Sequence, residues 1–113
     1  MPPKANPLKL NGLQLRTLAL AQVLARADGL ARRDPATGEV RLAALPHAHG
    51  NHVHIGPFAV SARDASGFAN PSVWVALERK GLARRDAAST VLTQAGMEYD
   101  TGFGDRFAAP SDH

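Results

Sequence analysis

Residues 60–96 restrict the fold of this 113-residue chain more than any other stretch. Ser61 and Asp64 have the S-x-x-D spacing of a helix start, so a short helix is predicted over 61–67. A second helix is predicted over 70–80, because an Asn-Pro pair supplies its cap and first residue and a glycine follows its end. Two short helices joined by a tight turn are typical of a helix-turn-helix.

The second of these helices has an apolar side, formed by Val73, Trp74 and Leu77, which we expect to face the core. The pattern over 82–93 then predicts two strands joined by a turn, and Thr93 caps a short final helix. A helix-turn-helix followed by a two-stranded hairpin is the layout of a winged helix-turn-helix.

Three segments keep a fixed order within this stretch: Asp64-Ala65-Ser66-Gly67-Phe68, Ala76-Leu77-Glu78-Arg79-Lys80-Gly81-Leu82 and Leu92-Thr93-Gln94-Ala95-Gly96. In order and spacing they resemble the helix-to-turn segment, the end of the recognition helix and the segment after the wing in MarR-like winged-helix transcription regulators. The resemblance covers about a third of the chain. It implies a homodimer that binds twofold-symmetric sites in double-stranded DNA, with the Leu-rich first helix as a candidate dimer face.

The second helix of a helix-turn-helix places its N-terminal side chains on base edges, while neighbouring cations bind phosphates. Asn pairs with adenine, Ser donates or accepts, and Val contacts the thymine methyl group. The net charge of +3 is compatible with such a partner. The predicted base-contacting residues are Asn70, Ser72, Val75 and Arg79, and the predicted phosphate-contacting residues are Arg63, Arg84 and Arg85.

Four of the five histidines lie within residues 47–54, on both sides of Gly50-Asn51. Gly-Asn is a favourable two-residue hairpin loop, and a turn there places all four imidazoles on one face of a β-hairpin. Imidazoles in this arrangement can bind Zn²⁺, Ni²⁺ or Cu²⁺. The alternative is a polar hairpin whose histidine rings are solvated, contact DNA phosphate or cap backbone groups. The candidate metal ligands are His47, His49, His52 and His54.

The chain before residue 60 predicts one helix and three strands. Asn11 and Gln14 have capping-box spacing, so a helix is predicted over 11–28. Its apolar residues recur at helical spacing, and a glycine follows its end. Antiparallel strands are predicted around 30–33, 39–45 and 52–55.

The predicted fold class is therefore α+β: a winged helix-turn-helix with an N-terminal helix and an extra His-rich β-hairpin. Residues 1–9 contain three prolines and two lysines, and we expect them to form a flexible basic arm. Residues 10–101 are expected to form a single winged-helix domain, and residues 102–113 a flexible tail.

Composition excludes several classes of function. The chain has no cysteine, which excludes disulfides, thiol nucleophiles and Cys-containing zinc sites. It has no recognisable catalytic motif, so we expect a protein that is not an enzyme. Its apolar runs are far shorter than the ~20 residues that span a bilayer, so we expect a cytoplasmic protein without a membrane partner.

The leading prediction is a sequence-specific DNA-binding transcriptional regulator. Two alternatives stay open. One is a metal-responsive regulator that senses through the histidine hairpin, and the other is a protein-interaction adaptor built on the same scaffold.

Overall fold

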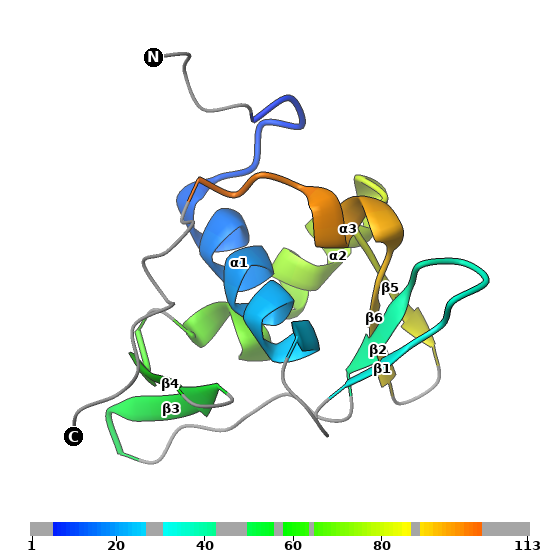
Figure 1. Cartoon of the computed structure of the whole chain (residues 1–113). Coiled ribbons are helices and arrows are strands. Elements are labelled where there is room, and N and C mark those ends of the chain that lie inside the picture. Colours follow the sequence, from blue (N-terminus) through cyan, green and yellow to red (C-terminus); the bar gives the residue numbers. More distant parts are fainter. Residues whose placement is uncertain are drawn as a thin grey trace.

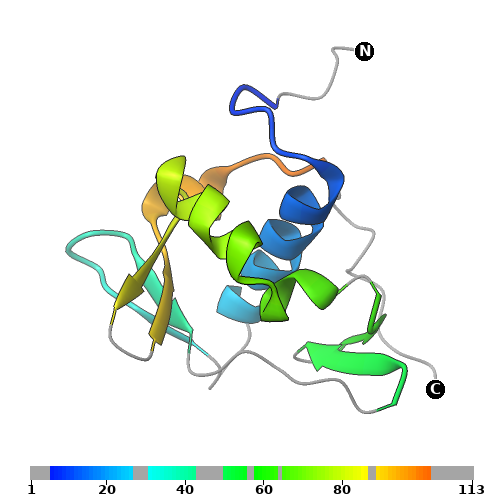
Figure 2. The same ribbon diagram turned by 180° about the vertical axis from the view of Figure 1, so that it is seen from behind.

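A long central helix, α1 (Gly12–Arg26), organises the structure, and most other elements pack around it (Figures 1 and 2). The computed structural model describes residues 6–26, 31–42, 50–55, 58–63, 65–86 and 89–102. The remaining elements are β1 (Ala31–Arg33), β2 (Val40–Leu42), β3 (His52–Ile55), β4 (Phe58–Ser61), the 3₁₀ helix η1 (Ser66–Ala69), α2 (Pro71–Arg79), β5 (Ala83–Asp86), β6 (Ser89–Leu92) and α3 (Gln94–Glu98).

The start of α1 confirms the predicted capping box. The Asn11 side chain accepts a hydrogen bond from the Gln14 amide at 2.8 Å, and the Gln14 side chain accepts one from the Asn11 amide at 3.0 Å. These two bonds satisfy donors that a helix start otherwise leaves unpaired. The helix is described to Arg26, so the glycine expected to end it lies outside the described residues.

Two hairpins form one four-stranded antiparallel sheet in the order β1-β2-β6-β5. The first hairpin turns at residues 34–38, where the Asp34 side chain accepts from the Ala36 amide and Gly38 has a φ of +75°. Val40, Leu42 and Leu92 point from the sheet into the core that contains α1. The expected strands around 30–33 and 39–45 are confirmed as β1 and β2 over the described residues.

The described part of the chain is thus a mixed α+β structure, but the helix predicted over 61–67 is wrong. Residues 60 and 61 belong to β4, where Val60 pairs with Val53 of β3. Only the short η1 follows, because too few residues remain before Pro71 to repay the cost of nucleating an α-helix. Gly67 belongs to η1 and permits its close approach to α1, since a Cβ there would lie 1.8 Å from the Thr17 hydroxyl oxygen.

The dimer face expected on α1 would have to use residues other than its most deeply buried leucines. Leu18 and Leu20 have no exposed surface, and Leu24 is 2% exposed, because the chain itself covers them. The homodimer itself stays a prediction.

The ends of the described region pack together. Asn6–Lys9, assigned above to the basic arm, form a turn in which the Leu8 amide donates to the Tyr99 hydroxyl at 3.2 Å. The Gln22 side chain of α1 donates to the carbonyls of Gly96 at 2.8 Å and Tyr99 at 2.9 Å. These bonds fix α3 and the chain after it against α1.

None of the helices in the described ranges combines the length and the apolar character needed to cross a membrane.

Candidate nucleic-acid interface

Helix α2 begins and ends as its sequence predicts. The Asn70 side chain caps it by accepting from the Ser72 amide at 3.0 Å, and Pro71 occupies the first helical position. At the other end, Gly81 has a φ of +75°. The amide of Leu82 donates to the Leu77 carbonyl at 2.9 Å, which is the 6→1 bond of a Schellman motif.

One face of α2 is fixed in the core, as predicted. Val73, Trp74 and Leu77 are all buried. The Trp74 ring stacks on Phe68 with 6.2 Å between ring centroids, and its Nε1 donates to the Phe68 carbonyl at 3.0 Å. The Trp74 side chain therefore holds η1 against α2. The 3₁₀ helix η1 stands where the longer helix was expected.

The opposite face of α2 is exposed and carries three of the predicted base-contacting residues. Ser72, Val75 and Arg79 lie at i, i+3 and i+7, so they form one stripe along the helix. Val75 is 45% exposed and is the one large hydrophobic residue classed as exposed within the described ranges. Glu78 is also exposed beside this stripe. Glu78 is not among the residues predicted from the sequence, although helical spacing places it next to Val75.

Asn70 is part of the cap as well as a predicted base contact. Its Oδ1 already accepts from the Ser72 amide, so pairing with adenine through both ends of the amide would share that oxygen with the helix cap. This makes Ser72, Val75 and Arg79 the principal candidates for base contacts.

The three predicted phosphate-contacting arginines lie on different parts of the surface. Arg63 lies in the turn after β4 and not on a helix. Arg85 faces α2, where its guanidinium carbon is 5.6 Å from the centroid of the Trp74 ring. Arg84, one residue earlier on β5, is on the opposite face of the sheet because side chains alternate along a strand.

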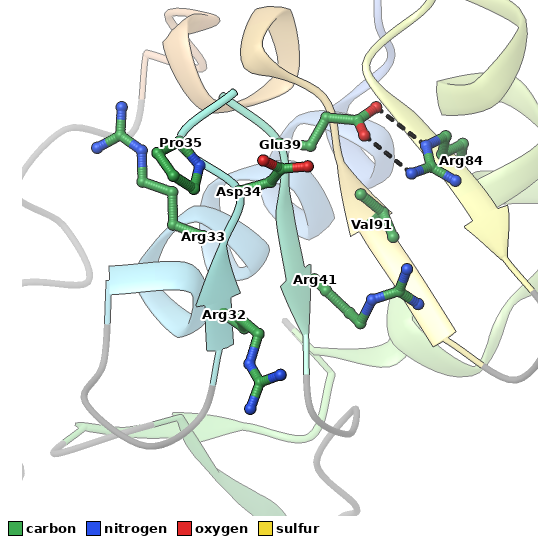
Figure 3. A pocket seen from close by; sticks show the side chains of 8 residues that line it. All are labelled: Arg32, Arg33, Asp34, Pro35, Glu39, Arg41, Arg84 and Val91. Carbon is green, nitrogen blue, oxygen red and sulfur yellow. Dashed lines mark hydrogen bonds and ion pairs between the residues drawn. The ribbon is translucent and has the colours of Figure 1, made fainter. Parts of the chain in front are cut away.

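Arg84 forms a bidentate ion pair with Glu39, the residue directly before β2. Its Nε lies 2.9 Å from Oε2 and its Nη2 lies 2.8 Å from Oε1 (Figure 3). The hydrogen bonds from Arg84 lower the pKa of Glu39 below its ordinary value of 4.5, against a smaller upward effect of burial. Sequence reasoning missed this pair because its members are 45 residues apart.

The described half of the histidine cluster is consistent with the predicted common face. The Nε2 atoms of His52 and His54 are 3.2 Å apart, and the ring centroids are 4.9 Å apart. Val53 between them is buried on the other side of the strand. His47 and His49 lie outside the described residues, as does the expected pairing of their strand with β3. Within the described residues, the partner of β3 is β4, and no group of three or more metal-ligating side chains occurs.

Comparisons with protein-family models, with curated proteins and with solved structures give no match to this chain.

Proposed function

We propose that this protein is a DNA-binding regulator that reads double-stranded DNA with the exposed face of α2. The main support is the exposed stripe of Ser72, Val75 and Arg79 on a helix whose other face is buried in the core. A hydroxyl, a small apolar side chain and a guanidinium are the groups that distinguish bases in the major groove.

The rigidity of α2 supports this proposal. Both ends of the helix are capped, and Trp74 anchors it to η1 through stacking and a hydrogen bond. A base-reading helix needs such support because its contacts depend on side chains held in fixed register. The β5–β6 hairpin follows α2 directly, in the position of a wing, and its strand β5 packs on α2. In this interpretation the fold is a winged helix-turn-helix in which η1 stands where the first helix of the pair would be.

Charge also favours a polyanionic partner. The net charge is +3, and the exposed Arg79 and Arg85 are on or beside α2. Exposed arginines near a reading helix bind phosphates and give the salt dependence typical of protein–DNA complexes.

The experiment is a selection of bound fragments from random duplex DNA with the full chain, followed by titration of the selected duplex. Ser72→Ala and Arg79→Ala should each weaken binding to the selected duplex by about 10-fold, since one good base contact is worth about 1–3 kcal/mol. Arg16→Ala is the matched control, because it removes one positive charge from α1 and not from α2. Equal loss in Arg16→Ala and Arg79→Ala would mean that net charge, and not the α2 stripe, determines affinity.

A second candidate function is a metal-responsive regulator, and the His52–His54 geometry favours it. Two imidazole nitrogens that share a tetrahedral Zn²⁺ at ~2.0–2.1 Å lie about 3.3 Å apart, close to the observed 3.2 Å. Zn²⁺ would act here as a structural or sensing ion. His52 and His54, together with His47 and His49, would hold it, and no carboxylate would be needed.

Calorimetric titration with Zn²⁺ and with Ni²⁺ tests this second candidate. We expect about one ion per chain near neutral pH, with weaker binding as the pH falls because protons compete for the same lone pairs. His52→Ala and His54→Ala should each weaken binding, whereas His113→Ala should not change it. Heat no larger than that of a variant with all four clustered histidines changed to alanine would remove the metal candidate.

A further inference from the structure

A row of arginines crosses the face of the four-stranded sheet that points away from the core. Arg32 on β1 is directly opposite Arg41 on β2, and Arg41 is opposite Val91 on β6. Val91 is in turn opposite Arg84 on β5. Directly opposed residues share a face, so Arg32, Arg41 and Arg84 form one arginine row across the sheet (Figure 3).

The arginine row borders a hollow of about 330 Å³. Val91, on the same face, is 1% exposed although it lies outside the main hydrophobic core. Pro35 and Asp34 of the β1–β2 turn complete one side of the hollow, and Glu39 and Arg84 line the other (Figure 3). The hollow therefore combines a small apolar surface with guanidinium groups.

Positive side chains outnumber negative ones among the described residues that line this hollow. The described lining contains four arginines, the arginine row and Arg33, and two carboxylates, Asp34 and Glu39; the guanidinium of Arg33 points away from the row (Figure 3). Glu39 is already committed to Arg84 through both of its oxygens. Arg32 and Arg41 stand at directly opposite positions on adjacent strands, so two guanidinium side chains start from neighbouring points of this face.

We propose that this hollow is a binding site for a phosphate group. A guanidinium presents two parallel N–H donors that match the oxygens of a phosphate, and several guanidiniums can share its charge. A volume of about 330 Å³ is at the small end of ligand sites, which fits one phosphate with a small attached group or one phosphate of a nucleic-acid strand.

The site is separate from the proposed reading face. Arg84 and Arg85 alternate along β5, and Arg85 is the one that faces α2. The hollow lies on the Arg84 side, so the two proposals stand on different residues and can fail independently.

The experiment measures the thermal unfolding temperature of the full chain in increasing inorganic phosphate, with chloride adjusted to keep the ionic strength constant. Phosphate should raise this temperature in a saturable way, because a ligand that binds only the folded state stabilises it. Arg32→Gln and Arg41→Gln should abolish the rise. The rise is measured for each variant from its own unfolding temperature without phosphate.

Three further variants separate the possible causes. Arg32→Lys keeps the charge but loses the two-pronged donor, so it should weaken the phosphate effect. Arg16→Gln removes a charge from α1 and should keep the full effect, as should Arg79→Ala on α2. Absence of a phosphate effect in the wild type, or a full effect in both Arg32→Gln and Arg41→Gln, would overturn the proposal.

Two added ligands then identify the source of the phosphate. Glycerol 3-phosphate should reproduce the effect if the natural ligand is a small phosphate monoester. A short single-stranded oligonucleotide should produce the stronger effect if the site binds a nucleic-acid backbone. A rise in unfolding temperature with either ligand supports the phosphate site, provided that the same ligand produces no rise in Arg41→Gln.

Discussion

The substitution Gly96→Ala tests the packing of α3 against the end of α2. A Cβ added at Gly96 would lie 1.9 Å from the Leu82 carbonyl oxygen and 2.9 Å from the Leu82 carbonyl carbon. Both are backbone atoms, so no side-chain rotation can relieve the overlap. The two segments would have to separate by about 1.5 Å to restore ordinary contact.

That separation disturbs several hydrogen bonds at once. The Leu82 carbonyl accepts from the Thr93 amide at 3.1 Å, and the Gly96 amide donates to the Thr93 hydroxyl at 3.0 Å. Loss of a cap costs about 1 kcal/mol, loss of a hydrogen bond about 1 kcal/mol, and overpacking about 1–3 kcal/mol. Alanine regains about 1 kcal/mol through its higher helix propensity. The net expectation is a loss of about 2–4 kcal/mol in the free energy of unfolding.

Urea unfolding followed by tryptophan fluorescence measures this loss, because Trp74 is the only tryptophan and is buried in the core. Gly12→Ala is the matched control. It is also a helical Gly→Ala change, but its Cβ would be 3.7 Å from the nearest side-chain atom, an ordinary contact. We expect Gly12→Ala to be neutral or slightly stabilising. A Gly96→Ala variant as stable as the wild type would refute the close approach of α3 to Leu82.

Three other substitutions test the core and the sheet. Trp74→Ala should lower the free energy of unfolding by about 3–5 kcal/mol, measured by thermal unfolding followed by circular dichroism; a variant that stays fully stable would contradict the packing of α2. Gln22→Leu should cost about 2–4 kcal/mol by the same measurement, because two carbonyls lose their donor; a neutral change would show that these carbonyls find other partners. Glu39→Gln tests pH linkage. The pKa of Glu39 is lowered in the folded state, so the ion pair with Arg84 stabilises the protein above pH 4.5, and this contribution is lost as the pH falls through the folded pKa. The difference in stability between wild type and Glu39→Gln should therefore shrink as the pH falls below 4.5, and a difference that does not change with pH would contradict it.

Elements with signals at their own ends were predictable from the sequence. The capping box of α1, the turn at residues 34–38, and the Asn70 cap and Gly81 end of α2 all use side chains and backbone geometry within a few residues. The apolar face of α2 was also predictable, because helical spacing alone places Val73, Trp74 and Leu77 on one side.

The β3–β4 hairpin shows what local signals do not decide. Gly50-Asn51 and Gly56-Pro57 are both turn signals flanking the same strand, and each gives it a different partner. In the structure Val53 pairs with Val60 and both are buried, so tertiary packing places residue 60 in a strand. The local S-x-x-D preference for a helix over 61–67 is weaker than the stabilisation from burying this strand pair.

One candidate site was predictable from local sequence spacing, and the other was not. Exposure of Ser72, Val75 and Arg79 followed from the helix phase. The arginine row and the Arg84–Glu39 pair depend on the register of β1, β2, β6 and β5, which join segments far apart in the chain. No local pattern carries that register.

The most direct test of the central claim is a fluorescence-anisotropy titration of the selected duplex with wild type and with Val75→Glu. Val75 is exposed on α2, so the change should leave the unfolding temperature unchanged. It places a negative charge against the DNA, so duplex affinity should fall by at least about 10-fold at every salt concentration. Duplex affinity that is equal in the two proteins, or absent in the wild type even at low salt, would contradict DNA reading by α2.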